Sequence, residues 1–251
     1  MRIALLADIH GNTIALDAVL TDIQNRGGVD GYWIMGDFVA LGPDPVGVLE
    51  RISKLKDLRV IRGNTDRYVV SGDRPSPTLQ ATAADPSLLP ALVEVANTFA
   101  WTQGMITAAG YWQWLKDLPL EFTLTLPDGT PFLGVHASPG MDDGSGISPE
   151  MADDAIEKLV GATNAKLIVM GHTHLPLNNR WRGIHLVNPG AVSLTLTPDK
   201  QAHYALLSAT ANGYAIEHHQ VGYNRQAVIH QLGQLHHPGR AYLIRHLSDH
   251  S

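Results

Sequence analysis

Short apolar runs alternate with amphipathic stretches along the first seventy residues of the chain. Three brief apolar runs bounded by turn residues are predicted as buried strands: Arg2–Ala7, Tyr32–Met35 and Arg59–Arg62. Between them, apolar residues recur at helical spacing from Ile14 to Ile23 after the capping residue Asn12, and Val46–Leu55 is predicted as a second helix. Strand–helix repeats of this length predict parallel strands joined by right-handed crossovers.

The pattern changes after the third predicted strand. Residues 71–90 are rich in Pro, Ser, Thr and Asp, and two helical stretches, Leu88–Trp101 and Ala108–Asp117, complete this segment. We predict that roughly residues 69–117 form a helical cap insertion over the core, and that the whole chain, residues 1–251, is a single domain carrying it. The apolar side chains of the insertion must pack on the core, on a substrate or on a second subunit, so a homo-oligomer is one interpretation.

Strand patterns dominate the second half of the chain. The predicted strands are Glu121–Leu126, Thr130–Val135, Lys166–Met170, Leu175–Trp181, Ile184–Val187, His203–Ser208 and Tyr214–His219. Ser148 and Pro149 are the expected cap and first residue of a helix that runs to about Val160, and a last helix is predicted over residues 225–235. Parallel units followed by hairpins indicate an α/β protein with two packed sheets and helices outside, rather than one doubly wound sheet.

Composition narrows the function classes. Hydrophobic residues make up 44% of the 251 residues, which favours a packed core over disorder. The net charge is −6 and the chain has no basic block, so neither a membrane surface nor a nucleic acid larger than a nucleotide substrate is expected as a partner. The absence of cysteine excludes disulfides, thiolate zinc sites and cysteine nucleophiles. No apolar stretch has the length of a signal peptide or a membrane span, and we predict a cytoplasmic location.

Histidine is unusually frequent, with 13 residues. Six of them lie in polar stretches toward the C-terminus and are predicted to be solvent-exposed: His218, His219, His236, His237, His246 and His250. The histidines that suggest chemistry lie elsewhere in the chain.

Polar residues capable of binding metal follow several predicted strands directly. These candidate ligands are Asp8, His10, Asp37, Asn64, His136, His172 and His174. Because the carboxyl ends of strands line one edge of an open α/β sheet, the loops that carry these residues are expected to converge on a single crevice. Each short motif taken alone would be an ordinary turn or an isolated histidine, whereas the whole series at strand ends favours a site.

The donor set is typical of transition metals. Imidazole nitrogens combined with carboxylate and carbonyl oxygens suit Mn, Fe, Co or Zn, whereas Ca and Mg prefer shells made only of oxygen. Two acids, four histidines and an amide are too many for one tetrahedral ion, and they suit two ions with one bridging carboxylate.

The series of motifs resembles that of the calcineurin-like metallophosphoesterase superfamily. The matching motifs are Asp8-x-His10, Gly36-Asp37, Gly63-Asn64-x-Asp66, His136, Gly171-His172-x-His174 and Asn188-Pro189-Gly190-Ala191-Val192. The last of these is similar to small bacterial and archaeal phosphodiesterase-type members. The resemblance implies a four-layer α-β-β-α sandwich of two mixed sheets. It also implies two divalent transition-metal ions, drawn from Mn, Fe, Zn, Co or Ni, with Mn favoured.

The resemblance further implies a role for each ligand. Asp8, His10 and His174 would hold one ion. Asn64, His136 and His172 would hold the other, and Asp37 would bridge both. Asp37, Asn64 and Asp66 are the implied catalytic residues.

Thr65 departs from the pattern of many family members, which carry histidine at this position to protonate the leaving group. Threonine cannot act as an imidazolium acid, so Asp66 lacks the partner that it would normally orient. The departure argues against high turnover on alkyl monoesters. Arg67 adjoins this loop and is a candidate phosphate contact, with a structural salt bridge as the alternative interpretation.

These observations predict a metal-dependent phosphoesterase that hydrolyses small phosphate esters, phosphodiesters above all. The expected mechanism is in-line attack by a metal-bridging hydroxide, because two ions lower the pKa of a shared water. One alternative is a phosphomonoesterase or phosphoprotein phosphatase with the same site. Another is a non-catalytic scaffold for protein partners, although every ligand expected from the resemblance is present.

Overall fold

Two five-stranded mixed sheets form the centre of the computed structural model, which describes residues 1–248. The first sheet has the order β10-β9-β1-β2-β3 and consists of β1 (Arg2–Leu6), β2 (Gly31–Ile34), β3 (Leu58–Val60), β9 (Ala202–Thr210) and β10 (Gly213–Val221). Strands β1, β2 and β3 are parallel, and β9 runs antiparallel to β1.

The second sheet has the order β4-β5-β6-β8-β7. It consists of β4 (Phe122–Thr125), β5 (Pro131–Gly134), β6 (Leu167–Val169), β7 (Leu177–Trp181) and β8 (Ile184–Asn188). Its central strands β5, β6 and β8 are parallel, and the edge strands β4 and β7 are antiparallel to their neighbours.

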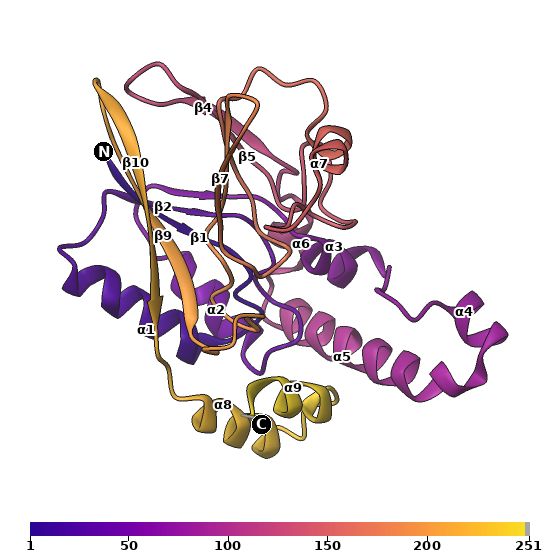
Figure 1. Ribbon diagram of the computed structural model, residues 1–251. Helices are drawn as coiled ribbons and strands as arrows, with labels where there is room; N and C mark the ends of the chain where they lie inside the picture. Colours follow the sequence, from indigo (N-terminus) through magenta and orange to yellow (C-terminus); the bar gives the residue numbers. More distant parts are fainter. Residues whose placement is uncertain (249–251) are drawn as a thin grey trace.

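Alternation of side chains along the strands explains the layers. Ile3 and Leu5 of β1 belong to the core between the two sheets, whereas Ala4 and Leu6 belong to the core beneath the helices. Helices α1 (Thr13–Asn25) and α2 (Pro45–Ile52) cover the outer face of the first sheet, and α7 (Asp153–Val160) covers that of the second (Figure 1). The predicted four-layer α-β-β-α sandwich is therefore confirmed.

Residues 64–116 are mostly helical, with a non-helical stretch at 72–78. They form α3 (Asn64–Ser71), α4 (Leu79–Ala84), a 3₁₀ turn (Pro86–Leu88), α5 (Leu89–Ala108) and α6 (Trp112–Lys116). Phe99 and Ile106 of α5 are buried in the core that α1 and α2 share with the first sheet, so the inner part of α5 is anchored there. The outer end of α5 and α4 extend away from the sheets (Figure 1).

The C-terminal region contains one helix more than the sequence analysis predicted. Besides α8 (Arg225–Gln234), the structure contains α9 (Arg240–Leu247). Leu243 and Leu247 of α9 pack with Val228 and Leu232 of α8 over Leu194, which forms a small apolar cluster. The short length of α9 gave it little periodic signal in the sequence.

The predicted start of the helix that ends near Val160 is wrong. Helix α7 begins at Asp153 rather than at Ser148, because two aspartates in its first turn favour that N-terminus and Ser148 lies in the preceding loop.

The C-terminal histidines are not uniformly exposed either. His237 is 1% exposed beside Trp101, and the Nε2 atoms of His218 and His246 are hydrogen-bonded to backbone carbonyls. His219 is half-buried and His236 is exposed, while His250 lies outside the described residues. Among residues 1–248, no helix is long and apolar enough to cross a membrane.

Candidate metal centre

The seven candidate ligands converge at one edge of the sandwich, as the sequence analysis predicted. Both sheets contribute to this edge, because loops after β1, β2, β5 and β6 and the start of α3 all end there. The members brought together are Asp8, His10, Asp37, Asn64, His136, His172 and His174. His172 and His174 are partly exposed, and the others are buried.

The backbone of the ligand loops is strained at most of these positions. Five of the ligands have positive φ angles: Asp8 (56°), His10 (48°), Asp37 (58°), His172 (69°) and His174 (58°). Non-glycine residues avoid this left-handed region, and clusters of such residues are typical of functional sites. The sharp turns direct neighbouring side chains toward one point.

Gly63 is needed for close packing behind the site. A Cβ atom at this position would lie 2.0 Å from Asp37 Oδ1, far inside van der Waals contact. The loop after β3 can therefore approach the loop after β2 only if this residue is glycine. This approach also lets the Thr65 N–H donate a hydrogen bond to Asp37 Oδ1 (3.0 Å).

Each of the four histidines has one ring nitrogen hydrogen-bonded to a backbone carbonyl. The pairs are His10 Nδ1 with Ala40 O (3.1 Å), His136 Nδ1 with Met35 O (2.5 Å), His174 Nδ1 with Leu194 O (2.7 Å) and His172 Nε2 with Gly144 O (2.8 Å). A carbonyl can only accept, so these ring nitrogens carry hydrogen and the opposite nitrogen of a neutral ring offers a lone pair. Metal-binding histidines are oriented in this way.

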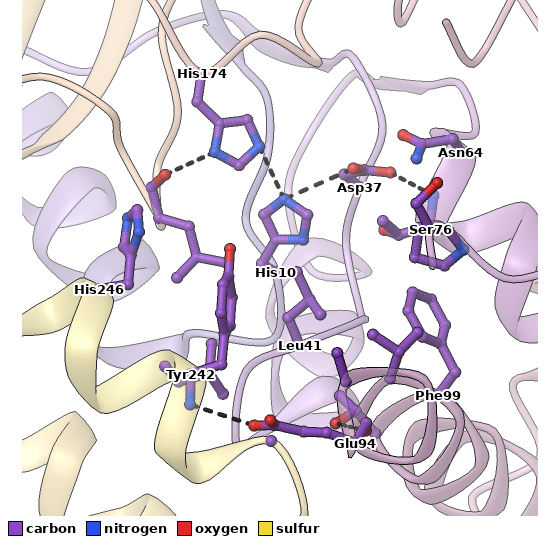
Figure 2. Close-up of a pocket in the computed structure, with 18 of the residues that line it drawn as sticks. His10, Asp37, Leu41, Asn64, Ser76, Glu94, Phe99, His174, Tyr242 and His246 are labelled. Carbon is purple, nitrogen blue, oxygen red and sulfur yellow. Dashed lines mark hydrogen bonds and ion pairs between the residues drawn. The ribbon is translucent and has the colours of Figure 1, made fainter. Parts of the chain in front are cut away.

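The free nitrogens face one another and the oxygen donors. His10 Nε2 lies 3.1 Å from His174 Nε2 and 3.6 Å from Asp37 Oδ2. Dashed lines mark both contacts in Figure 2. On the other side, Asn64 Oδ1 lies 3.1 Å from both His136 Nε2 and His172 Nδ1. Asp37 Oδ2 also lies 3.5 Å from His136 Nε2, so this carboxylate lies between the two groups.

These separations fit metal binding. Two ligand atoms that each lie about 2.1 Å from one ion are about 3.0–3.4 Å apart in octahedral or tetrahedral geometry. The observed separations of 3.1–3.6 Å lie at or close to this range. Donor atoms of Asp8, His10 and His174 also lie within 4.8 Å of one another, and so do those of Asp8, Asp37 and His136. The donor set and its spacing therefore fit divalent ions of the transition series.

Burial and charge set the protonation of the centre. Burial lowers the pKa of His10 and His174 to about 4, which keeps both rings in the neutral form that binds metal. His136 behaves differently, because the charge of Asp37 outweighs burial and raises the pKa of His136 to about 10. The same pairing lowers the pKa of Asp37 far below its usual range, although burial opposes it. A bound cation would replace the proton of His136.

Asp66 lies behind the centre. Its carboxylate accepts hydrogen bonds from the backbone N–H groups of Asp37 (2.8 Å), Phe38 (2.9 Å) and Gly63 (2.9 Å). These contacts bind the loop after β2 to the start of α3. These contacts give Asp66 a role in positioning Asp37, and its predicted catalytic role stays a prediction.

Arg67 forms ion pairs with three aspartates. Its Nε, Nη1 and Nη2 atoms donate to Asp142, Asp73 and Asp143 at 2.9–3.1 Å, as the salt-bridge alternative expects. Nη1 and Nη2 each carry a second hydrogen, so the phosphate contact stays a prediction. Arg62 also donates to Asp142 (2.7 Å). The sequence analysis missed this network, which joins α3 to the loop carrying Gly144, the acceptor for His172.

A cavity of about 530 Å³ opens beside the ligands. Thr65 lines it, and the Thr65 hydroxyl is buried with no hydrogen-bond partner among the described residues.

Comparisons with known proteins relate this site to others. The model of the calcineurin-like phosphoesterase superfamily domain matches residues 1–212. A metallophosphoesterase structure from Sphaerobacter thermophilus superposes over 98% of both chains, with a TM-score of 0.76 and 25% identity. The hypothetical protein PH1004 from Pyrococcus horikoshii shares the fold over 97% of this chain and 96% of its own, with a TM-score of 0.78 and 22% identity.

Two sequence relatives add to this picture. The uncharacterized protein MJ0912 of Methanocaldococcus jannaschii is 31% identical over 193 residues, which cover 76% of this chain and 70% of that protein. The symmetrical bis(5'-nucleosyl)-tetraphosphatase of Cronobacter sakazakii is 33% identical over 96 residues, which are 34% of each chain.

Proposed function

Because the chain belongs to the calcineurin-like phosphoesterase superfamily and is therefore a hydrolase of phosphate esters, we propose that it cleaves phosphodiesters with two divalent metal ions. Asp8, His10 and His174 would hold one ion. Asn64, His136 and His172 would hold the second, and Asp37 would contact both. The observation that carries the proposal is the set of four imidazoles, each fixed by a carbonyl on one nitrogen while the other faces oxygen or nitrogen donors.

When bound, such ions supply an acidified water as nucleophile and positive charge for the phosphoryl oxygens. The chain contributes orientation. The carbonyls of Ala40, Met35, Leu194 and Gly144 hold the rings, and Asp66 holds the backbone on which Asp37 sits. The mixed nitrogen and oxygen donor set suits Mn²⁺, Fe²⁺, Co²⁺ or Zn²⁺. Among these we propose Mn²⁺, the ion that the family resemblance favours.

The absence of an imidazole at Thr65 argues against high turnover on alkyl monoesters. Without that acid, the reaction depends on a leaving group that departs readily or on protonation by water. The local similarity to a bis(5'-nucleosyl)-tetraphosphatase makes a nucleotide phosphate one candidate substrate. The helical segment of residues 69–117 would then act as an insertion that selects the substrate. A monoesterase with the same site is the second candidate, and the full ligand set disfavours a scaffold.

The test is hydrolysis of bis-p-nitrophenyl phosphate and p-nitrophenyl phosphate, with Mn²⁺ and with chelator. We expect cleavage of the diester to exceed that of the monoester and to be lost with chelator. Asp37→Ala should abolish turnover and lower the bound metal content measured by mass spectrometry, whereas Asp17→Asn at a half-exposed surface carboxylate should change neither. Two bound metals with no cleavage of either ester would reject the proposal of a general phosphodiesterase.

A further inference from the structure

The cavity beside the metal centre extends well beyond the candidate ligands. One end is formed by His10, Asp37 and Asn64, and the remainder by α5, α9 and the loop near Leu194 (Figure 2). Its volume of about 530 Å³ falls within the range of roughly 300–1,000 Å³ typical of pockets for organic ligands. A phosphoryl group at the ligands would leave most of this space for another part of the substrate.

One face of α5 lines the cavity. The residues concerned are Ala91, Glu94, Val95, Thr98 and Phe99, at the i, i+3, i+4, i+7 and i+8 spacing of a helix stripe. Val93, on another side of the same helix, is 48% exposed and does not line the cavity. The α5 wall is therefore mostly apolar, with Glu94 as its charged member.

Helix α9 forms the facing wall. Tyr242 is 48% exposed, and its ring extends into the cavity with the hydroxyl end toward His10 and His174 (Figure 2). The Tyr242 N–H donates to Glu94 Oε1 (3.3 Å), which joins α9 to α5. His246 is held by a hydrogen bond between its Nε2 and Thr195 O (3.1 Å). These contacts place an accessible aromatic ring opposite the apolar stripe of α5.

We propose that this cavity binds the organic group of the phosphodiester that lies away from the leaving group, and that this group is flat, aromatic and of nucleoside size. The proposal rests on the proposed function. The walls are mostly apolar and include Glu94, Arg245 and His246 as ionisable members, so they favour a largely apolar group with a few polar atoms. An aromatic ring such as Tyr242 offers a stacking surface for another ring. Because the cavity is continuous with the candidate metal ligands, the group that it binds would be covalently joined to the reacting phosphate.

Two esters with the same leaving group test the proposal by activity. They are the p-nitrophenyl ester of thymidine 5′-phosphate and methyl p-nitrophenyl phosphate. Burial of a nucleoside in the cavity should raise kcat/KM for the thymidine ester at least about 10-fold over the methyl ester. Val95→Trp, which fills the cavity from α5, should bring the ratio of kcat/KM for the thymidine ester to that for the methyl ester close to one. Tyr242→Ala should lower the same ratio. Val93→Trp is the matched control and should leave it unchanged.

Binding of thymidine 5′-phosphate in the presence of Mn²⁺, followed by calorimetry, tests the cavity without turnover. Val95→Trp should weaken binding at least about 10-fold, and Val93→Trp should not, with thermal melts confirming that both variants fold. Equal binding by wild type, Val95→Trp and Tyr242→Ala would overturn the inference even if both esters are cleaved. Binding that depends on Val95, without cleavage of any ester, would support the cavity and reject the proposed function.

Discussion

Thr65 carries a buried hydroxyl that has no partner among the described residues, while its backbone N–H is bonded to Asp37. Thr65→Val keeps the shape and the N–H bond and removes the unsatisfied oxygen. We therefore expect the free energy of unfolding to rise by about 1 kcal/mol, measured by urea denaturation of the metal-free protein.

Thr13→Val is the comparison for this change. The Thr13 hydroxyl donates to Asp44 Oδ2 (3.1 Å), so its loss should lower the free energy of unfolding by about 1 kcal/mol. A loss of stability in both variants would mean that the Thr65 hydroxyl does have a partner, contrary to the expectation.

His237 should make stability depend on pH. Burial lowers its pKa to about 4, its Nδ1 accepts the Gly239 N–H (3.1 Å), and its ring packs edge-on against Trp101 of α5. Between about pH 6.5 and pH 4, His237 binds a proton in the unfolded chain but stays neutral in the folded chain. The free energy of unfolding therefore falls as the pH falls through this window.

We expect His237→Phe to reduce the loss of unfolding free energy between pH 7.5 and pH 5 by about 1–2 kcal/mol. The measurement is urea denaturation at both pH values with chelator present. His236→Phe changes the exposed neighbour and should leave the pH dependence as in the wild type. Identical pH dependence in both variants would contradict the assignment.

At the scale of elements, the ion-pair network between α3 and the loop of residues 137–147 supports His172 indirectly. Asp142 accepts from Arg62 and Arg67, and the same loop provides Gly144 O to His172 Nε2. Asp142→Asn should loosen this loop and weaken Mn²⁺ binding about 10-fold in a calorimetric titration, as expected for a residue that supports a ligand. Asp154→Asn, in an exposed pair with Lys158, should not alter Mn²⁺ binding. Unchanged affinity in Asp142→Asn would show that the loop holds His172 without the network.

The sequence predicted the elements where local pattern and burial agree. Strands such as β1 and β6 are short apolar runs, and the residues that follow them converge because of strand direction, which needs no knowledge of contacts. Helix α7 was extended too far because Ser148 and Pro149 are a local cap signal that also occurs in loops. The pairing of Arg67 with Asp142 could not be predicted, because 75 positions separate the partners along the chain. Helix α9 was missed, and with it the cavity wall at Tyr242.

At the scale of the whole molecule, metal should stabilise the fold. The candidate ligands come from loops of both sheets, so an ion that binds them binds only the folded arrangement. At a free Mn²⁺ concentration 100 times Kd, the gain is about 2.7 kcal/mol per site, which corresponds to a rise in Tm of roughly 5–10 °C for a chain of this size. Thermal melts with Mn²⁺ and with chelator measure this rise in Tm. Asp37→Ala should lose most of the shift, and an equal shift in that variant would place the ion elsewhere.

The wall that α9 adds to the cavity lies at residues 240–247, outside the segment of residues 1–212 that the family model matches. The reacting end of the cavity and its opposite wall are thus encoded in separate stretches of the chain. Mutations in the C-terminal stretch can change the shape of the cavity, and so the substrates that it accepts, without moving any residue that would hold an ion. Such a division permits the substrate specificity to change during evolution while the reaction stays the same.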